Sequence, residues 1–306
     1  MSEYTFAMPR RAFAAITFCI AAYSPVFGQS HSVHELAPGV FVWQGDRDNR
    51  EPANCTWVVF KDYVLVIDAN FPWGAREILS KIKSTTDKPI RFVAVTHYHA
   101  DHTFGSSVFK DAGATIICTD ACGEEIWTKN PSGWAKWNNP QHSLEGARFE
   151  PATVTFSDRM EFDDGVQRVE LIRLGPAHTQ GDSVAWLPKQ KIVATGDLCV
   201  TWAFGNNVGD ASADYDNWLH ALDTMIDWAP VSVIPGHGAP GSVEALRTER
   251  AYLSDMVNHV REGKRMGKSA DELAKTIDLS RHGTIAHDQD ANASSIRAVY
   301  RHLQNQ

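Results

Sequence analysis

Short apolar runs bounded by turn residues alternate along the chain with longer amphipathic segments. The first three runs are GVFVWQG (39–45), CTWVVF (55–60) and YVLVIDA (63–69), and they have the length and the β-branched and aromatic content of strands. The second and third flank KDY (61–63), a connection short enough for a β-hairpin. The chain is therefore expected to open with paired strands.

A helical pattern follows in AREILSKIK (75–83) and leads into a strand-like run, RFVAV (91–95). The next segment, SSVFKDAGATIIC (106–118), is typical of a helix, a glycine-bearing turn and a strand in succession. The order strand, helix, strand indicates an α/β fold built in layers.

The second half of the chain repeats this alternation. Strands are predicted in RVELIRL (168–174), SVAWL (183–187), KIVATGD (191–197) and VSVIPGHG (231–238). Helices are predicted over residues 215–228, 242–264 and 292–304, the first because Trp218, Leu219, Leu222 and Ile226 lie near helical spacing. Both halves thus combine helices with strands.

The segment between these halves, from about Ile126 to Pro151, has a different pattern. WTKNPSGWAKWNNPQH (127–142) mixes Trp127, Trp134 and Trp137 with Asn, Pro, Gly and Ser, which predicts a loop. Such a loop could lie on the surface, packed by its own aromatic side chains, or form a lid beside a functional site. The sequence leaves both alternatives open.

The N-terminus has the pattern of an export signal. Arg10 and Arg11 precede the apolar run AFAAITFCIAAYSPVF (12–27), which ends in GQS. Pro25 interrupts the run, and the run is short for a membrane anchor, so we expect residues 1–28 to be a cleaved signal peptide. The predicted mature chain is a single domain, residues 29–306, that is exported to the periplasm or secreted and not inserted in a membrane. RRAF (10–13) resembles a twin-arginine signal, so the sequence does not decide between the two export routes.

Composition and charge argue against one class of partner, and the cysteine spacing leaves the state of the thiols open. The 306 residues are 43% hydrophobic and 22% charged, which is typical of a globular protein. The net charge of −8 argues against nucleic acid as a partner. Cys55 and Cys199 stand alone, while Cys118 and Cys122 lack the spacing of a zinc ribbon, so we expect buried thiols or one local bridge.

One polar cluster stands out at the end of a predicted strand. His97 and His99 occupy alternate positions and therefore share one face, where they can grip the same ion. Asp101 and His102 follow where the chain turns, so they can point towards a second ion. Imidazole nitrogens and carboxylate oxygens are ligands that zinc favours, and imidazole also suits iron.

Three further candidate ligands occupy the same kind of position. His178 follows the strand 168–174, Asp197 ends the strand 191–197, and His237 lies between two glycines after the strand that begins at 231. Functional sites of layered α/β folds form at strand ends, so these side chains are expected to converge. A bound cation would offset the cost of burying them.

Four ordered motifs carry a resemblance to a known family. THYHADH (96–102), GPAHTQGD (175–182), ATGD (194–197) and PGHG (235–238) together resemble the metallo-β-lactamase-fold hydrolases, over nearly all of the predicted mature chain. The resemblance implies an αββα four-layer sandwich, in the α/β class, with a two-metal site between its two sheets.

The resemblance also implies a role for each motif residue. Seven metal ligands fall into two groups that share one aspartate. They are His97, His99 and His178 for the first zinc ion, Asp101, His102 and His237 for the second, and Asp197 bridging both. A hydroxide would be the remaining shared ligand. Asp68, in VLVIDAN (64–70), matches an aspartate expected to orient a ligand without contacting metal.

A two-zinc site implies hydrolysis. Two cations lower the pKa of a shared water, polarise a carbonyl and hold the leaving anion, while Asp101 is placed to manage a proton. The expected reaction is cleavage of an ester, thioester, lactone or amide bond. A bridging Asp197 resembles glyoxalase II-like thioesterases and lactonases, because β-lactamase branches usually have cysteine or serine there. Export nevertheless suits a β-lactam substrate, so that activity stays open.

The predicted pocket wall comes from two loops. NFPWG (70–74) and TWAFGNN (201–207) should border the metals, and their candidate wall residues are Phe71, Trp73, Trp202, Phe204 and Asn207. These residues suggest a small-molecule substrate with an apolar body. No Lys or Arg in the motifs stands out as a clamp for a carboxylate. The physiological substrate and the oligomeric state are not predicted.

Two alternative functions remain. The same fold could hold iron in a redox enzyme, although all-imidazole ligation of the first ion favours zinc. The chain could also be a non-catalytic metal-binding accessory protein of the periplasm. Metal content and hydrolytic turnover distinguish both alternatives from a zinc hydrolase.

Overall fold

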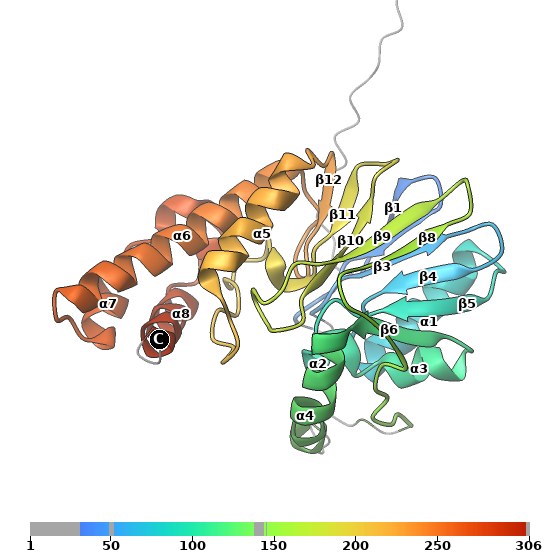
Figure 1. Ribbon diagram of the computed structural model, residues 1–306, viewed down its shortest axis with the longest axis horizontal. Helices are drawn as coiled ribbons and strands as arrows, with labels where there is room; N and C mark the ends of the chain where they lie inside the picture. The colour runs from blue at the N-terminus through green and yellow to red at the C-terminus, as the bar shows by residue number, and fades with distance from the viewer. Residues whose placement is uncertain (1–30, 49–51, 138–143, 145, 304–306) are drawn as a thin grey trace, which may run out of the picture.

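Two β-sheets packed face to face form the centre of the molecule, and helices cover their outer faces (Figure 1). The computed structural model describes residues 31–48, 52–137, 144 and 146–303. The predicted signal peptide, residues 1–28, lies outside the described residues. No helix in these ranges combines the length and apolarity needed to span a membrane.

The first sheet has seven strands in chain order, β1 to β7. Their bounds are Val33–Ala37, Val40–Trp43, Cys55–Val59, Val64–Ile67, Ile90–Ala94, Thr115–Thr119 and Val154–Phe156. Neighbours pair antiparallel from β1 to β4 and parallel from β4 to β7. The amide of Phe60 donates to the carbonyl of Tyr63 over 2.8 Å in the β3–β4 connection, so the predicted hairpin is confirmed.

The second sheet has five strands in the order β12-β11-β10-β9-β8. Strands β8 to β12 span Arg159–Asp163, Arg168–Arg173, Ser183–Leu187, Ile192–Ala194 and Ser232–Ile234. All neighbours pair antiparallel except β11 and β12, which are parallel. The connection between these two includes a long helix, as a parallel crossover requires.

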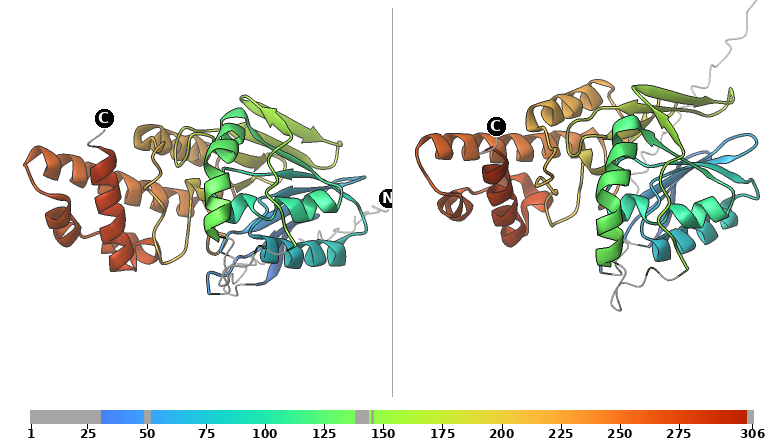
Figure 2. Two further views of the ribbon diagram at one scale, coloured as in Figure 1. Left: turned by 90° about the horizontal axis from the view of Figure 1, so that it is seen from below. Right: turned by 60° about the horizontal axis from the view of Figure 1, so that its bottom comes forward.

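Three buried clusters hold the layers together. Between the sheets lie side chains such as Val42 and Leu65 from the first sheet and Leu171 and Ile192 from the second. On the outer face of the first sheet pack α1 (Pro72–Thr85) and α3 (Ser106–Asp111), as Figure 2 also shows. The second sheet is covered by α5 (Tyr215–Asp227) and α6 (Val243–Arg265), and α8 (Gln289–His302) packs on α6 on the side away from the sheet. The predicted αββα sandwich is confirmed.

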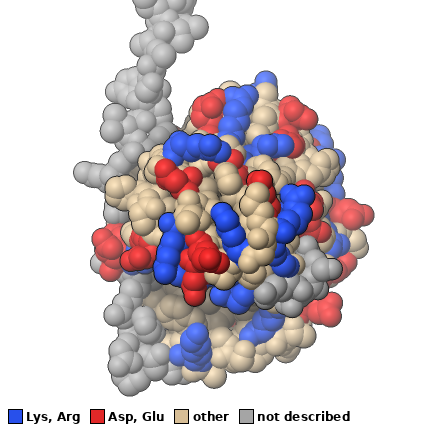
Figure 3. Space-filling view, turned by 90° about the vertical axis from the view of Figure 1, so that its left-hand side faces the viewer, with Lys and Arg blue, Asp and Glu red and all other residues tan. Residues whose placement is uncertain are grey.

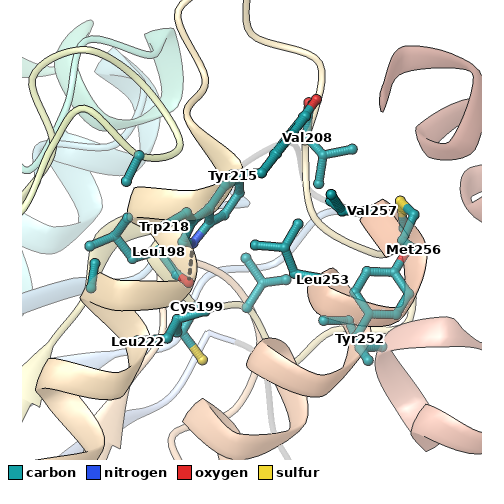
Figure 4. Packing of buried hydrophobic residues seen from close by; sticks show 14 of the residues in the cluster. Leu198, Cys199, Val208, Tyr215, Trp218, Leu222, Tyr252, Leu253, Met256 and Val257 are labelled. Carbon is teal, nitrogen blue, oxygen red and sulfur yellow. Dashed lines mark hydrogen bonds between the residues drawn. The ribbon is translucent and has the colours of Figure 1, made fainter. Parts of the chain in front are cut away.

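The predicted helix at 215–228 packs on the segment that follows β11. Figure 4 shows Tyr215, Trp218 and Leu222 of α5 in one apolar cluster with Leu253 of α6. The indole nitrogen of Trp218 donates to the carbonyl of Leu198 over 3.0 Å. Leu198 ends a short 3-10 helix, η1 (Gly196–Leu198), so the core fixes the backbone next to Asp197.

The prediction of a loop from Ile126 is wrong for residues 126–137, because α4 (Asp120–Trp137) continues through them. Pro131 and Gly133 weaken the local helical signal, but tertiary packing outweighs it. Trp134 packs against Phe104 at 4.9 Å between ring centroids, and Trp137 against Phe71 at 4.8 Å. Residues 138–143 and 145 of the predicted loop lie outside the described residues.

Several short elements are not predicted by the hydrophobic pattern. They are β1, β7, β8, α2 (Ala100–Thr103), α7 (Ala270–Thr276) and η2 (Ser280–Ala286). Helix α7 begins with a capping box, in which the Ser269 hydroxyl and the Glu272 carboxylate satisfy each other's backbone amides.

Lysines, arginines and carboxylates are interspersed over the face formed by the C-terminal helices, without a single-sign patch (Figure 3). Cys55, Cys118, Cys122 and Cys199 are buried free thiols, so the local bridge is absent.

Candidate metal centre

Four strand ends converge at one edge of the sandwich and bring the motif histidines together. His97 and His99 follow β5, and Asp101 and His102 lie on the short helix α2 directly after them. From the second sheet, His178 follows β9, Asp197 lies in η1 after β11, and His237 follows β12. Their side chains form two groups that could each hold a metal ion, His97–His99–His178–Asp197 and Asp101–His102–His237.

The first group surrounds one oxygen of Asp197. The Nε2 atoms of His97 and His178 each lie 3.7 Å from Oδ2 of Asp197. His99 completes the group, with its Nδ1 atom 3.1 Å from Nε2 of His178. Three imidazoles and a carboxylate thus face a common point, which is a donor set suited to zinc.

The second group lies on the other side of the same carboxylate. Nε2 of His102 lies 3.3 Å from Oδ1 of Asp197, and Nε2 of His237 lies 3.2 Å from Oδ1 and 3.3 Å from Oδ2. The Asp101 carboxylate lies 3.4 Å from Nε2 of His237 and 4.0 Å from Nε2 of His102. Asp197 therefore stands between the two groups.

Two glycines allow Asp197 to sit this close to the neighbouring strand ends. A Cβ atom on Gly236 would lie 2.0 Å from Oδ1 of Asp197, which no side chain could accommodate without displacing the carboxylate. Gly196 has a positive φ of 52°, and its Cβ would lie 2.4 Å from Oγ1 of Thr96. The glycines of ATGD and PGHG thus have a steric role at the centre.

Asp68 orients two of the histidines from behind. Its Oδ1 atom accepts from the amide of Thr96 at 2.7 Å, and the Thr96 hydroxyl lies 3.0 Å from both carboxylate oxygens. Oδ2 of Asp68 lies 2.9 Å from Nδ1 of His102, and Oγ1 of Thr96 lies 3.0 Å from Nδ1 of His97. Both imidazoles therefore present Nε2 to the centre. Asp68 itself has a positive φ of 63°, which turns its buried side chain towards these partners.

The other imidazoles are oriented by groups that lie far away in the sequence. Nδ1 of His237 lies 2.8 Å from the carbonyl of Pro52, so its Nε2 atom also points to the centre. Nε2 of His99 lies 3.5 Å from Oδ2 of Asp210, which leaves Nδ1 for the centre. Such outer partners fix the tautomer and the ring orientation of metal-binding histidines.

The electrostatics of the two groups differ. Burial, reinforced by neighbouring histidines, lowers the pKa of His97 well below its usual value and that of His178 to about 3. Burial opposes charge at His102 too, but the carboxylates of Asp68, Asp197 and Asp101 outweigh it and raise the pKa of His102. Burial would raise the pKa of Asp197, but His237 and His102 outweigh it and hold that pKa well below the usual range. His97 and His178 thus offer neutral imidazole lone pairs, the form that binds metal.

The residues fit a pair of cations. Nε2 of His97 and Oδ1 of Asp197 are both buried and have no hydrogen-bond partner among the described residues, although both face the centre. Orphaned buried polar atoms cost free energy unless something compensates them, and a cation would satisfy both atoms here.

A cleft beside the centre contains some of the predicted wall residues. It has a volume of about 770 Å³, and its lining includes His99, Asn207 and residues of α4. Trp202, Phe204 and Asn207 line an adjoining compartment of about 300 Å³. Phe71 is buried and stacks on Trp73, with ring centroids 4.8 Å apart, and neither residue is among the lining of these two spaces.

The sequence motifs do not reveal several residues that the structure brings to the centre. Asp210 lies on an irregular loop 112 residues from its partner Tyr98, whose hydroxyl donates to it. Lys129 of α4 lies 3.4 Å from the Asp210 carboxylate and 2.8 Å from that of Glu125. Arg47 also lines the smaller compartment, so cationic side chains do lie near the centre. No periodicity or spacing marks these positions, because only tertiary folding brings them together.

Comparison with known proteins gives a family. The profile of the Metallo-beta-lactamase superfamily matches residues 48–237. A type 2 metallo-beta-lactamase of Bacillus sp. (strain 170) is 30% identical over 169 residues, which cover 54% of this chain and 58% of that protein. The type 2 metallo-beta-lactamase of Bacillus cereus is 27% identical over 169 residues, 54% of this chain and 59% of that protein. The chain thus matches less than two thirds of the length of these relatives.

Solved structures share the fold at lower sequence identity. A stereoselective inverting sec-alkylsulfatase from Pseudomonas sp. superposes with a TM-score of 0.70 at 17% identity, covering 89% of this chain and 50% of that chain. A metallo-beta-lactamase from Pontibacter korlensis has a TM-score of 0.59 at 22% identity and covers 73% of this chain and 99% of that chain. The part of this chain shared with the sulfatase is larger than the part shared with the lactamase.

Proposed function

The chain belongs to the metallo-beta-lactamase superfamily, and on that premise we propose that it is a binuclear zinc hydrolase. Its reaction is the hydrolysis of an ester, thioester, lactone or amide bond in a small molecule, with β-lactams among the candidate amides. One observation carries the proposal: the Asp197 carboxylate lies between the two groups of ligands, with His237 close to both of its oxygens, at 3.2 Å from Oδ1 and 3.3 Å from Oδ2. Oδ2 faces His97 and His178 at 3.7 Å, and Oδ1 faces His102 and His237 at 3.3 and 3.2 Å.

The ligand assignment follows these groups. His97, His99 and His178 would hold the first ion, Asp101, His102 and His237 the second, and Asp197 both. Two zinc ions held there would supply an activated water nucleophile and polarise the scissile carbonyl. The all-imidazole donor set opposite Asp197 supports zinc over the harder cations.

Residues of this chain would perform the remaining tasks. Asp101 is the most exposed of the seven ligand candidates, with 21% of its side chain accessible, so it can exchange a proton with solvent. Asp68 would act through His102 and Thr96, which it contacts, and not on the substrate. The cleft that contains His99 would admit the substrate.

Export is part of the proposal. Its support is the N-terminal pattern of two arginines, a short apolar run and small residues before position 29. Mass spectrometry of the N-terminus after expression in a Gram-negative host would identify the cleavage site, and an intact residue 1 in the periplasmic fraction would contradict cleavage.

A substrate panel tests the activity. Zinc-loaded wild type and Asp101→Asn would be assayed with aryl esters, lactones, thioesters, β-lactams and a secondary alkyl sulfate. We expect turnover of at least one carbonyl substrate and a loss of about 10²-fold in Asp101→Asn, the size typical of a lost proton-transfer group. If only the sulfate ester is turned over, the proposed substrate class changes from carbonyl compounds to sulfate esters. No turnover of any substrate with two zinc ions bound would contradict hydrolase function.

A further inference from the structure

A second compartment with different chemistry adjoins the cleft beside the metal centre. The larger part contains His99, and the smaller part lies between the 202–209 loop and α8. Asn207 and Gly209 line both parts, so the two are adjacent. Trp202 lines the smaller part and stacks on the ring of His237, with centroids 4.2 Å apart and planes 15° apart. The larger part thus contains the ligand candidate His99, and the smaller part is linked to His237 through the Trp202 ring.

The larger part is polar, and its Lys129 is paired with carboxylates of the protein. Its α4 wall carries Thr128, Lys129, Asn130, Ser132 and Lys136. The ammonium of Lys129 lies 2.8 Å from the Glu125 carboxylate and 3.4 Å from the Asp210 carboxylate. Lys129 is therefore a poor counter-ion for a substrate.

The smaller part is lined by aromatic side chains on one side and by small side chains on the other. Trp202 and Phe204 face small residues of α8, which are Ala291, Ser294, Ser295 and Ala298. The indole nitrogen of Trp202 donates to the carbonyl of Gly205 over 2.6 Å, so the ring is fixed in this wall. An apolar chain or ring would fit between these surfaces.

Arg47 is the one charged residue among the described residues that line this smaller part. Its guanidinium carbon lies 3.7 Å above the centroid of the Phe204 ring, a cation–π contact that holds the side chain in place. Among the described residues Arg47 forms no ion pair, because the neighbouring Asp46 carboxylate faces His31 at 3.8 Å. Its charge is thus available to a ligand, and its planar fork suits a carboxylate.

Helix α8 is anchored firmly enough to serve as a wall. The amide of Asp288, which caps α8, donates to the carbonyl of Ala203 over 3.1 Å. Asn292 donates to the carbonyl of Ala286 at 2.8 Å and accepts from the Tyr252 hydroxyl at 2.9 Å. The helix lies beyond the segment that the superfamily profile matches, residues 48–237. This wall is therefore a feature of the C-terminal part of the chain.

We propose that the compartment between Trp202, Phe204 and α8 binds the non-reacting part of the substrate, and that this part is an apolar chain or ring ending in a carboxylate paired with Arg47. The inference rests on the proposed function. The substrate class is then an ester, or a related acyl compound, whose acyl part bears an apolar body and a terminal carboxylate. Water cleaves the bond between the acyl carbon and the leaving group, giving a dicarboxylic acid and a protonated leaving group.

Matched pairs of substrates test this specificity on the zinc-loaded full chain. The pairs are 4-nitrophenyl monoesters of linear dicarboxylic acids and the same compounds with the distal carboxyl methylated. At the chain length that spans the cleft, we expect kcat/KM of wild type to be about tenfold higher for the acid, the size of one charge-assisted hydrogen-bond pair. In Arg47→Gln we expect the two to become equal, and in Arg47→Lys we expect an intermediate ratio, because a point charge replaces the fork.

The control variant is Arg247→Gln, an exposed arginine of α6 that pairs with Glu244 away from the cleft and should retain the wild-type ratio. Ser295→Phe, which narrows the compartment, should raise KM for the long acids. If wild type hydrolyses 4-nitrophenyl acetate but shows no preference for the acids at any length, or if Arg47→Gln keeps the preference, the inference is wrong while the hydrolase proposal stands. If wild type hydrolyses no ester but turns over a thioester, lactone or β-lactam, the inference is likewise wrong while the hydrolase proposal stands. If wild type with two zinc ions bound turns over none of these substrates, the hydrolase proposal itself is wrong.

Discussion

Replacing Asp68 with asparagine tests how the centre is oriented with almost no change in side-chain volume. In the native arrangement Oδ1 of Asp68 accepts from the amide of Thr96, and Oδ2 lies 2.9 Å from Nδ1 of His102. An asparagine can keep the first contact with its carbonyl oxygen, and its NH₂ group then faces His102. Because this group donates, Nδ1 of His102 must become an acceptor, and the proton moves to Nε2. Nε2 is the atom that faces Asp197 at 3.3 Å, so the predicted ligand atom is lost.

The expected size follows from which contacts change. The hydrogen bonds from the Thr96 amide and hydroxyl to Oδ1 survive, the second contact of that hydroxyl, at Oδ2, is lost, and the contact with His102 is inverted. Loss of an outer partner of this kind costs about 10–100-fold in metal affinity, or about 1.4–2.7 kcal/mol. The loss should fall on the second ion, since His102 belongs to the second group and His97, His99 and His178 keep their contacts.

A two-site zinc titration against a chelator of known affinity measures both dissociation constants. Of the two binding steps, we expect Asp68→Asn to weaken only the one that fills the second group, which includes His102. The other step should stay within about twofold of wild type. Asp111→Asn is the matched control, because Asp111 is exposed and pairs with Arg148 far from the centre. Unchanged affinity at both steps would refute the tautomer argument, and equal weakening of both would show a general structural effect instead.

Three further changes follow from the structure. Gly236→Ala places a Cβ atom 2.0 Å from Oδ1 of Asp197, so we expect a loss of about 1–3 kcal/mol of unfolding free energy and weaker zinc binding. The control Gly165→Ala, whose Cβ meets no atom within 4 Å, should leave zinc affinity unchanged. Normal zinc affinity in Gly236→Ala would contradict the steric argument. Burial raises the pKa of Glu249 from 4.5 to about 8, so the folded state keeps a proton that the unfolded chain releases. The contribution of this proton to the free energy of unfolding is complete below about pH 4.5 and declines as the pH rises to about 8, by at most ~1.4 kcal/mol per pH unit. Urea unfolding of the metal-free protein between about pH 6 and pH 8 should show that Glu249→Gln flattens this decline and that exposed Glu244→Gln does not; equal slopes in both variants would contradict it. Chelation should lower the thermal midpoint and zinc at about 100 times its Kd should add back about 2.7 kcal/mol, while a midpoint indifferent to both would argue against ligation.

The elements that the sequence predicts are those whose signals are local. The strand runs and the amphipathic helices at 215–228 and 242–264 have a regular period, and they correspond to β3, β4, α5 and α6. Helix α4 is missed because Pro131 and Gly133 suppress the local signal, and the packing of Trp134 on Phe104 that stabilises it is not visible in the sequence. Tertiary contacts override propensity at such positions.

The same distinction applies to the centre. The histidines of THYHADH are apparent from spacing, because alternate positions of a strand end share a face. Asp210 and Arg47 are not, since each lies in an irregular segment and reaches its partners, His99 and Phe204, only through the fold. Asp68 is an intermediate case: its position at a strand end is local, but its contact with His102 spans 34 residues.

The wall formed by α8 shows where the family pattern ends. The superfamily profile stops at His237, and the helices after it add a surface opposite Trp202 and Phe204. Specificity in this chain is therefore expected to depend on segments outside the shared motifs, since loops and additions around a common site are where substrate recognition varies.

Metal content per chain tests the central claim most directly. Protein purified without added metal and then equilibrated with zinc should be analysed by inductively coupled plasma mass spectrometry and by native mass spectrometry. Two zinc ions per chain in wild type, and a lower content in Asp197→Ala because both groups lose their shared carboxylate, is the predicted result. One ion per chain, or iron in place of zinc with no hydrolysis, would contradict a binuclear zinc hydrolase.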